Sequence, residues 1–410
     1  MEYKAYPRRW LLLVILCGIT FIPVYITNGF VVLHDVVASF YDITPYQADM
    51  LAVVGQLFYV TALGRIIMAF INGVTRTAQV LLAAAWFPQN ETATAFVLPV
   101  FAKTLAGIIS SLIYPYAIPN VDFPVDGSGT EFIPVKILFT ATHGFFSIVL
   151  LIALVLAVLY CDNDPPSPPN RSQENILISV ANSPKTTTQR SRLKAVWNAI
   201  YLKPFILLSL AMFFGDVAQS YAVFLMPSFV LSSFPELDNR IPGDISTIRA
   251  SVTSLIVIVT GRILDKYKSF KMVSIIGATT AILSFCCLYY AHTYKILPLI
   301  YIGYTAALSS RCIYGPAIVE FLMETTYPND KLRMMPVFGG ITSLGLFFWT
   351  SIMRILKENF DIGIATIAAI CISVALVLFI LSVEPDYKRL KTNKFEESPA
   401  KLDETTAMNK

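Results

Sequence analysis

The chain has 410 residues, of which 55% are hydrophobic and only 14% are charged. Soluble domains carry about 25% charged residues, so this composition excludes an ordinary soluble protein and is typical of a membrane protein. The net charge of +4 is too small for a nucleic-acid-binding chain, and the six cysteines lack disulfide or metal-ligand spacing, so we expect no nucleic-acid partner, no metal and no cofactor.

Membrane-spanning helices are predicted where an apolar run approaches about 20 residues. The predicted spans, in chain order, are residues 10–33, 94–118, 135–160, 204–230, 250–264, 271–292, 296–319, 334–357 and 361–383. The span at 250–264 is short. Residues 49–87 are also apolar but too long for one helix, because a helix rises only about 1.5 Å per residue. Counting that stretch as one crossing gives about ten spans.

Lysine and arginine gather in alternate segments, which is the charge bias of cytoplasmic loops. Basic residues cluster within 4–9, 161–203, 262–271, 331–333 and 388–394, whereas the opposite segments hold Lys136, Arg240, Arg249, Lys295 and Lys357. Both termini are therefore predicted to be cytoplasmic.

The segment 161–203 is rich in proline, serine and threonine, as flexible linkers are. It separates a shortened N-terminal helical bundle of about four spans, residues 1–160, from a C-terminal bundle of six spans, residues 204–384. Residues 385–410 form a cytoplasmic tail. Two bundles joined by a cytoplasmic linker favour a transporter, and a long regulatory loop in a receptor-like protein is the alternative.

A polar cluster, GRILDKYKSFK, ends the short span. We expect Gly261 to let two helices approach closely, and Asp265 to pair with a basic group or a helix N-terminus across the interface between the bundles. Lys266, Lys268 and Lys271 would hold the loop on the cytoplasmic side. The order of these residues resembles the loop signature G-x-x-x-D-[RK]-x-x-x-[RK] of the major facilitator superfamily, and plain cytoplasmic charge is the alternative.

Two further stretches narrow this resemblance. AAWFPQNETATA, residues 84–95, and PAIVEFLMETTYP, residues 316–328, resemble loop signatures of the feline leukaemia virus subgroup C receptor-related transporters, solute carrier family 49. RRWLLL near the start and EPDYKRL near the end are similar to the lysosomal branch of that family, named for disruption in renal carcinoma.

The resemblance implies an all-α polytopic membrane protein with the two-bundle fold of the major facilitator type. It implies a monomeric uniporter or proton-coupled carrier that moves a small organic solute by alternating access, in the plasma membrane or a lysosomal or endosomal membrane. The family's solutes suggest an organic cation or a vitamin-like molecule, with choline, ethanolamine, pyridoxine and haem as candidates.

The chain departs from the family in its first half. Members have twelve helices, whereas here residues 49–61 resemble the start of helix two and residues 62–87 resemble helix four. The rest of helix two, the first loop signature and helix three are missing. A non-transporting form, acting as a receptor or partner protein in the membrane, is therefore the alternative to a working carrier.

A charged residue inside a membrane span costs free energy, so we expect each one to have a functional or structural role. Asp216 lies mid-span, with Gln219 one helical turn later, and serves either as a counter-ion or proton-coupling group in a central cavity or as half of an interhelical ion pair. Arg311, also mid-span, would bind an anionic group or pair with Asp216. Glu320 and Glu324 share a helix face near the cytoplasm, where they form an inner gate with Arg262 or Lys266, or are solvated.

The resemblance adds candidate solute-binding residues. Tyr221 matches an aromatic residue that lines the organic-cation site of choline-transporting members. The second aromatic residue of that site, a tryptophan, falls near Thr27, beside Tyr25 and Asn28. Asn72 and Ser343 fall where those members carry glutamines. The sequence contains no nucleotide-binding loop, nucleophile elbow or paired-carboxylate motif, so we do not expect an enzyme.

Overall fold

The computed structural model describes residues 6–33, 82, 86–87, 92–117, 133–160, 201–236, 240–326 and 331–386. Its helices are α1 (Arg8–Val32), α5 (Thr92–Ala117), α6 (Ile133–Tyr160), α9 (Lys203–Gln219), η2 (Ser220–Phe224), α10 (Met226–Ser233), α11 (Arg240–Tyr267), α12 (Phe270–Thr293), α13 (Leu297–Thr326), α14 (Lys331–Asn359) and α15 (Ile362–Leu381). Every element in these ranges is helical, which confirms the predicted all-α fold. Most of the stretch 49–87 and the linker residues 161–200 lie outside the described residues.

Seven of the described helices are long and apolar enough to cross a membrane. They are α1, α6, α9 continued through η2, α11, α12, α14 and α15. Most of the predicted spans begin and end within a few residues of the observed helices, because a membrane span is a local run of apolar residues. The polytopic membrane fold is thereby confirmed.

The predicted short span at 250–264 is wrong. Helix α11 runs over 28 residues, from Arg240 to Tyr267. Its first part carries Ser246, Arg249 and Thr253, all of which are buried against other helices. These polar residues lower the local hydropathy, so the sequence placed Arg249 in an outer loop, whereas it lies within the span.

The predicted span 204–230 is broken into three pieces. Helix α9 passes into the π-helix η2, in which the Leu225 amide donates to the Ser220 carbonyl at 3.1 Å, and α10 follows. Pro227 at the start of α10 has no N–H and cannot continue the backbone hydrogen bonds of the preceding turn. Such π segments inside helices are frequent at functional sites.

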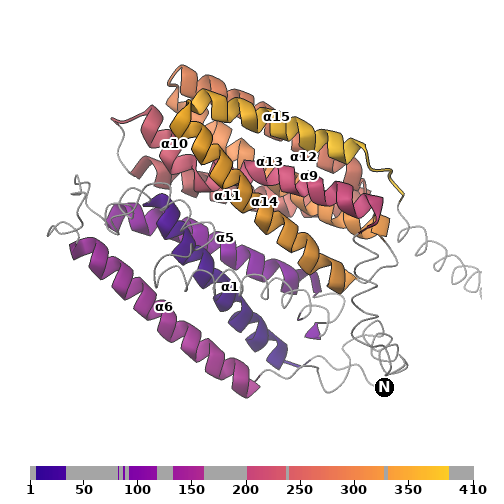
Figure 1. Ribbon diagram of the computed structural model, residues 1–410. Coiled ribbons are helices and arrows are strands. Elements are labelled where there is room, and N and C mark those ends of the chain that lie inside the picture. Colours follow the sequence, from indigo (N-terminus) through magenta and orange to yellow (C-terminus); the bar gives the residue numbers. More distant parts are fainter. Residues whose placement is uncertain are drawn as a thin grey trace, which may run out of the picture.

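The helices lie in two groups (Figure 1), with α1, α5 and α6 on one side and α9 to α15 on the other. One hydrophobic core is made only of residues between Phe205 and Val383. A second core joins α1, α5 and α6 and also takes in Phe224 of η2, with Val223 and Leu346 packed against it. The second core therefore connects the two groups of helices at η2 and α14.

Helix α11 also contacts the N-terminal group, mainly against α5. A Cβ atom at Gly243 would lie 2.8 Å from the Ser111 carbonyl oxygen and 2.6 Å from the Pro115 ring, so only glycine fits at this crossing. Nearby, the Tyr116 hydroxyl donates to Asp244 Oδ1 at 3.1 Å. The contact lies at the C-terminal end of α5 and the N-terminal end of α11, which the predicted topology places on the outer side.

Candidate functional site

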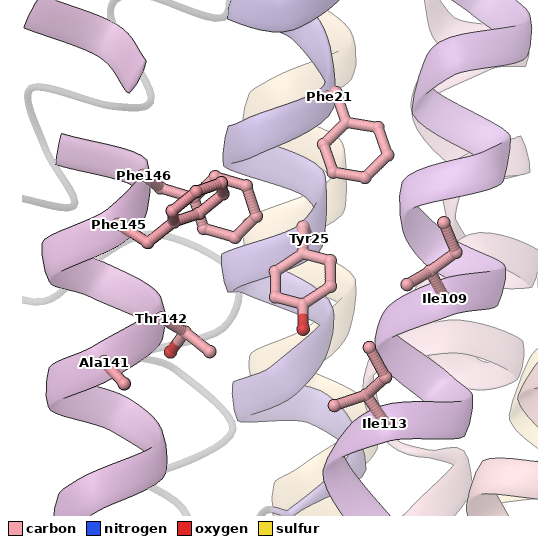
Figure 2. Close-up of a pocket in the computed structure, with 8 residues that line it drawn as sticks. All are labelled: Phe21, Tyr25, Ile109, Ile113, Ala141, Thr142, Phe145 and Phe146. Carbon is pink, nitrogen blue, oxygen red and sulfur yellow. The ribbon is translucent and has the colours of Figure 1, made fainter. Parts of the chain in front are cut away.

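An apolar pocket of about 430 Å³ opens between the three N-terminal helices (Figure 2). Its lining residues are Phe21 and Tyr25 from α1, Ile109 and Ile113 from α5, and Ala141, Thr142, Phe145 and Phe146 from α6. None of these side chains is charged, and the Thr142 hydroxyl donates to the Leu138 carbonyl of its own helix at 2.7 Å. The Tyr25 hydroxyl is therefore the main polar group that the lining offers to a ligand.

Aromatic rings gather around Tyr25. Its ring centroid lies 6.0 Å from that of Phe21, 4.9 Å from that of Phe146 and 5.4 Å from that of Tyr114. Phe21 and Tyr25 are four residues apart, so they share one face of α1. Aromatic faces within about 6 Å attract organic cations through the ring quadrupole. The pocket is thus chemically suited to a small cation with an apolar surface.

Asn28 ties α1 to α5 just beyond the pocket. Its side-chain nitrogen lies 3.1 Å from the Gly107 carbonyl, 2.8 Å from Ser110 Oγ and 2.7 Å from Ser111 Oγ. The sequence predicted Asn28 as a solute-binding residue. In the structure its amide nitrogen joins two helices and so fixes the position of the α1 face that carries Tyr25.

Asp216 and Arg311 form an ion pair between α9 and α13. The carboxylate Oδ1 accepts from Arg311 Nε at 3.2 Å and from Nη2 at 3.1 Å. The side chains are 2% and 18% exposed, so the carboxylate is buried. The interhelical pair that the sequence left as one alternative is therefore present, and neither residue lines the described pocket.

Tyr221 lies in the interior of the C-terminal helices. It is fully buried, its hydroxyl is 2.6 Å from Thr366 Oγ1, and its ring centroid is 4.4 Å from that of Phe229. The rings of Phe285 and Tyr304 complete the surrounding shell. The structure thus places Tyr221 in the core, and not on the pocket that contains Tyr25, because η2 turns its side chain toward α12, α13 and α15.

The remaining predicted binding residues are dispersed. Gln219 is half-buried at the end of α9, and Ser343 is exposed on α14, where its hydroxyl donates to the Gly339 carbonyl of the same helix at 2.9 Å. Asn72 lies outside the described residues. Among the predicted solute-binding residues that are described, Tyr25 is the one on the pocket lining.

The structure describes part of the loop signature. Among the described residues no atom lies within 4 Å of a Cβ placed at Gly261, and the close helix approach expected there stays a prediction. Lys271 donates to the Leu381 and Val383 carbonyls at 3.1 and 2.8 Å, which caps the C-terminal end of α15. Lys266 and Lys268 are exposed, and the Asp265 side chain lies outside the described residues.

The acidic pair on α13 is partly inside the protein. Glu324 is fully buried and Glu320 is half-buried, so a solvated end charge is the wrong interpretation for Glu324. Arg262 and Lys266, the predicted gate partners, are exposed on α11. The inner gate stays a prediction.

Sequence reasoning missed Phe21, Phe146 and Arg249. The four-residue spacing of Phe21 and Tyr25 was available as a signal, whereas Phe146 joins them only through the packing of α6 on α1. For Arg249 the signal was the spacing of Ser246, Arg249, Thr253 and Thr260, all buried on α11, which marks one polar helix face turned toward protein.

Known proteins resemble this chain in sequence. The family model described as the Major Facilitator Superfamily matches residues 4–331. The chain is similar to the choline/ethanolamine transporter flvcr2a of Danio rerio, with 29% identity over 67% of the chain and 56% of that protein. It is 24% identical to the choline/ethanolamine transporter FLVCR2 of Homo sapiens, over 83% of the chain and 62% of that protein. The chain thus spans less than two thirds of the length of these relatives.

Solved structures share the fold. The inward open xylose transporter XylE from E. coli matches with a TM-score of 0.60 at 12% identity, over 93% of this chain and 97% of that chain. The E. coli fucose:proton symporter FucP matches with a TM-score of 0.58 at 14% identity, over 91% and 98%. From the family match over most of its length, the chain belongs to the Major Facilitator Superfamily as an integral membrane protein, and its relatives confirm the predicted relationship to solute carrier family 49.

Proposed function

We propose that this chain carries a small organic solute with a cationic amine head across the membrane by alternating access. The observation that supports this most is the aromatic pocket around Tyr25, whose described lining includes the neighbouring rings of Phe21, Tyr25 and Phe146 and no charged side chain. A quaternary ammonium group is large and weakly hydrated, so it gains from aromatic faces without needing a carboxylate.

Choline and ethanolamine are the preferred candidates, because the relatives of this chain are named as transporters of these two amines. In choline the trimethylammonium group would rest against the Phe21, Tyr25 and Phe146 rings, and the Tyr25 hydroxyl is the polar group near which the choline hydroxyl would lie. Haem fits less well, since its two carboxylates would enter a pocket in which none of the described lining residues is basic.

The Asp216–Arg311 pair has a separate role in this proposal. It neutralises two charges within the C-terminal helices and joins α9 to α13 across the span that η2 interrupts. We assign this ion pair to the rigid framework of the C-terminal half. It would keep α9 fixed against α13 while the two halves rotate relative to each other during alternating access. The Asp216 carboxylate would then contribute to transport without touching the solute.

Uptake into proteoliposomes tests the proposal. The purified chain should take up labelled choline with saturation, and unlabelled choline should compete. The matched control is 3,3-dimethyl-1-butanol, which has the shape of choline without its charge and should compete poorly if cation–π attraction drives binding. Equal competition by the neutral alcohol would reject the cation site, and no uptake of any amine would favour the non-transporting alternative.

A further inference from the structure

Arg249 is a buried cation that the proposed transport function leaves unused. It is 3% exposed on α11, and within the described part of the chain no carboxylate forms an ion pair with it. Its Nη1 atom donates to the Ala222 carbonyl, and Nη2 lies 3.4 Å from Ser246 Oγ. An uncompensated guanidinium inside a span is costly, so its presence calls for a role.

The geometry of the π-helix explains why the Ala222 carbonyl accepts this hydrogen bond from a side chain. In the π register, the Ala222 carbonyl would accept from the residue five positions later, which is Pro227 and has no N–H. The backbone therefore cannot supply that donor. Arg249 supplies it from a neighbouring helix, and the charged donor makes this a strong hydrogen bond.

The π-helix is also where the two groups of helices meet. Phe224, two residues beyond Ala222, belongs to the hydrophobic core that contains Ile22 and Tyr25 of α1. On its other side, Ser220 Oγ donates to the Leu346 carbonyl of α14 at 3.2 Å. Through its hydrogen bond to Ala222, Arg249 therefore holds η2 in place. Phe224 of the same segment belongs to the core that contains Tyr25.

Helix α11 carries a second contact close to Arg249. Gly243 and Asp244, about one and a half turns earlier, meet Ser111 and Tyr116 of α5. Helix α11 therefore contacts the N-terminal helices directly and also binds the π-helix through the Arg249 hydrogen bond. When α11 separates from α5, the guanidinium must either carry the π-helix along or release the Ala222 carbonyl.

We propose that Arg249 is a positioning residue that couples the α5–α11 contact to the Tyr25 pocket by clamping η2 to α11. The role of this contact in transport rests on the proposed function. The contact between Arg249 and η2 does not, because it depends only on how the helices are arranged. In the conformation described, the clamp favours the state in which α5 and α11 touch. Without it, the separated state gains population.

Cysteine accessibility tests the clamp without requiring transport. Ser111, buried at the α5–α11 contact, is changed to cysteine in a background lacking the six native cysteines, and a membrane-impermeant maleimide is applied from each side of the membrane. Arg249→Gln should label about tenfold faster than the parent, the effect of losing one charge-assisted hydrogen bond in the contact state. Arg249→Lys, which can still donate to Ala222, should label at a rate near the parent.

Lys295→Gln is the matched control, because Lys295 is an exposed basic residue that belongs to neither the clamp nor the predicted inner gate. It should not change the labelling rate. In the uptake assay, Arg249→Gln should lower the maximal rate more than it changes KM, since the residue does not touch the solute. Unchanged labelling in Arg249→Gln, or equal acceleration in the lysine variant, would overturn the clamp, whereas absent uptake in the parent would reject only the proposed transport function.

Discussion

The guanidinium of Arg311 and the carboxylate of Asp216 lie 3.1 Å apart, on two different membrane-spanning helices, α13 and α9. The Arg311 guanidinium also lies 5.5 Å from the ring centroid of Tyr314, whose hydroxyl donates to the Gly215 carbonyl. Two adjacent residues of α9 are thus held by two residues of α13 one helical turn apart.

Breaking the ion pair from one side should destabilise the protein. Asp216→Asn leaves the Arg311 charge in the interior without its counter-ion, which is expected to cost about 3 kcal/mol. The double variant Asp216→Asn with Arg311→Gln should recover much of that loss, because no buried charge remains. Thermal unfolding in detergent measures both, and additive effects of the two substitutions would show that the residues are not coupled.

Removing the Asn28 amide should loosen α1 from α5. Asn28→Ala removes the hydrogen bonds that the amide makes to the Gly107 carbonyl and to the Ser110 and Ser111 hydroxyls, and should cost about 1–3 kcal/mol. KM for the solute should rise as well, since the Tyr25 face shifts.

Ser343→Ala is the control for Asn28→Ala. The Ser343 hydroxyl bonds only its own helix among the described contacts, so the substitution should change stability by less than about 0.5 kcal/mol. A large loss of uptake in Ser343→Ala would show instead that Ser343 binds the solute, as the sequence predicted.

Two glycines on α11 should respond in opposite ways to alanine. Gly243→Ala places a methyl group against the Ser111 carbonyl and the Pro115 ring, and such overpacking should cost about 1–3 kcal/mol. Gly261→Ala meets no described atom and should leave stability unchanged or raise it by up to about 1 kcal/mol through helix propensity. Thermal unfolding distinguishes them, and an equal loss at both positions would contradict the assigned contact.

Lys271→Met should weaken the end of α15. The ammonium group donates to the Leu381 and Val383 carbonyls, and its loss should cost about 1 kcal/mol. Lys266→Met, which removes an exposed lysine of the same signature, should be nearly neutral. Hydrogen exchange near residues 380–383 locates the effect, and identical exchange in both variants would argue against the cap.

Much of the fold could be predicted from sequence, because a span is defined by a local run of apolar residues. Helix α11 could not be predicted in full, since its Ser246, Arg249 and Thr253 are buried only through contacts with other helices. A proline such as Pro227 is a local signal for a break in a helix, but the π register before it depends on the packing of η2 against α13 and α14.

The candidate site was predictable only in part. The Asp216–Arg311 pair followed from the rule that charges inside spans are matched. Tyr25 was found by resemblance, whereas Phe146 reaches it from α6, more than a hundred residues later in the chain. Tyr221 was expected on the same site because alignment gives position in the chain but not the direction of the side chain.

The Tyr25 ring is the group proposed to bind a cationic amine. Choline uptake by proteoliposomes measures this binding most directly in three proteins, the parent, Tyr25→Phe and Tyr25→Ala, with Phe360→Ala as an exposed aromatic control. Tyr25→Ala should raise KM about fivefold or more, the effect of losing roughly 1–2 kcal/mol of cation–π attraction, while Tyr25→Phe keeps the ring, loses only the hydroxyl and should raise KM by less. A KM in Tyr25→Ala equal to that of the parent, with uptake intact, would contradict the account.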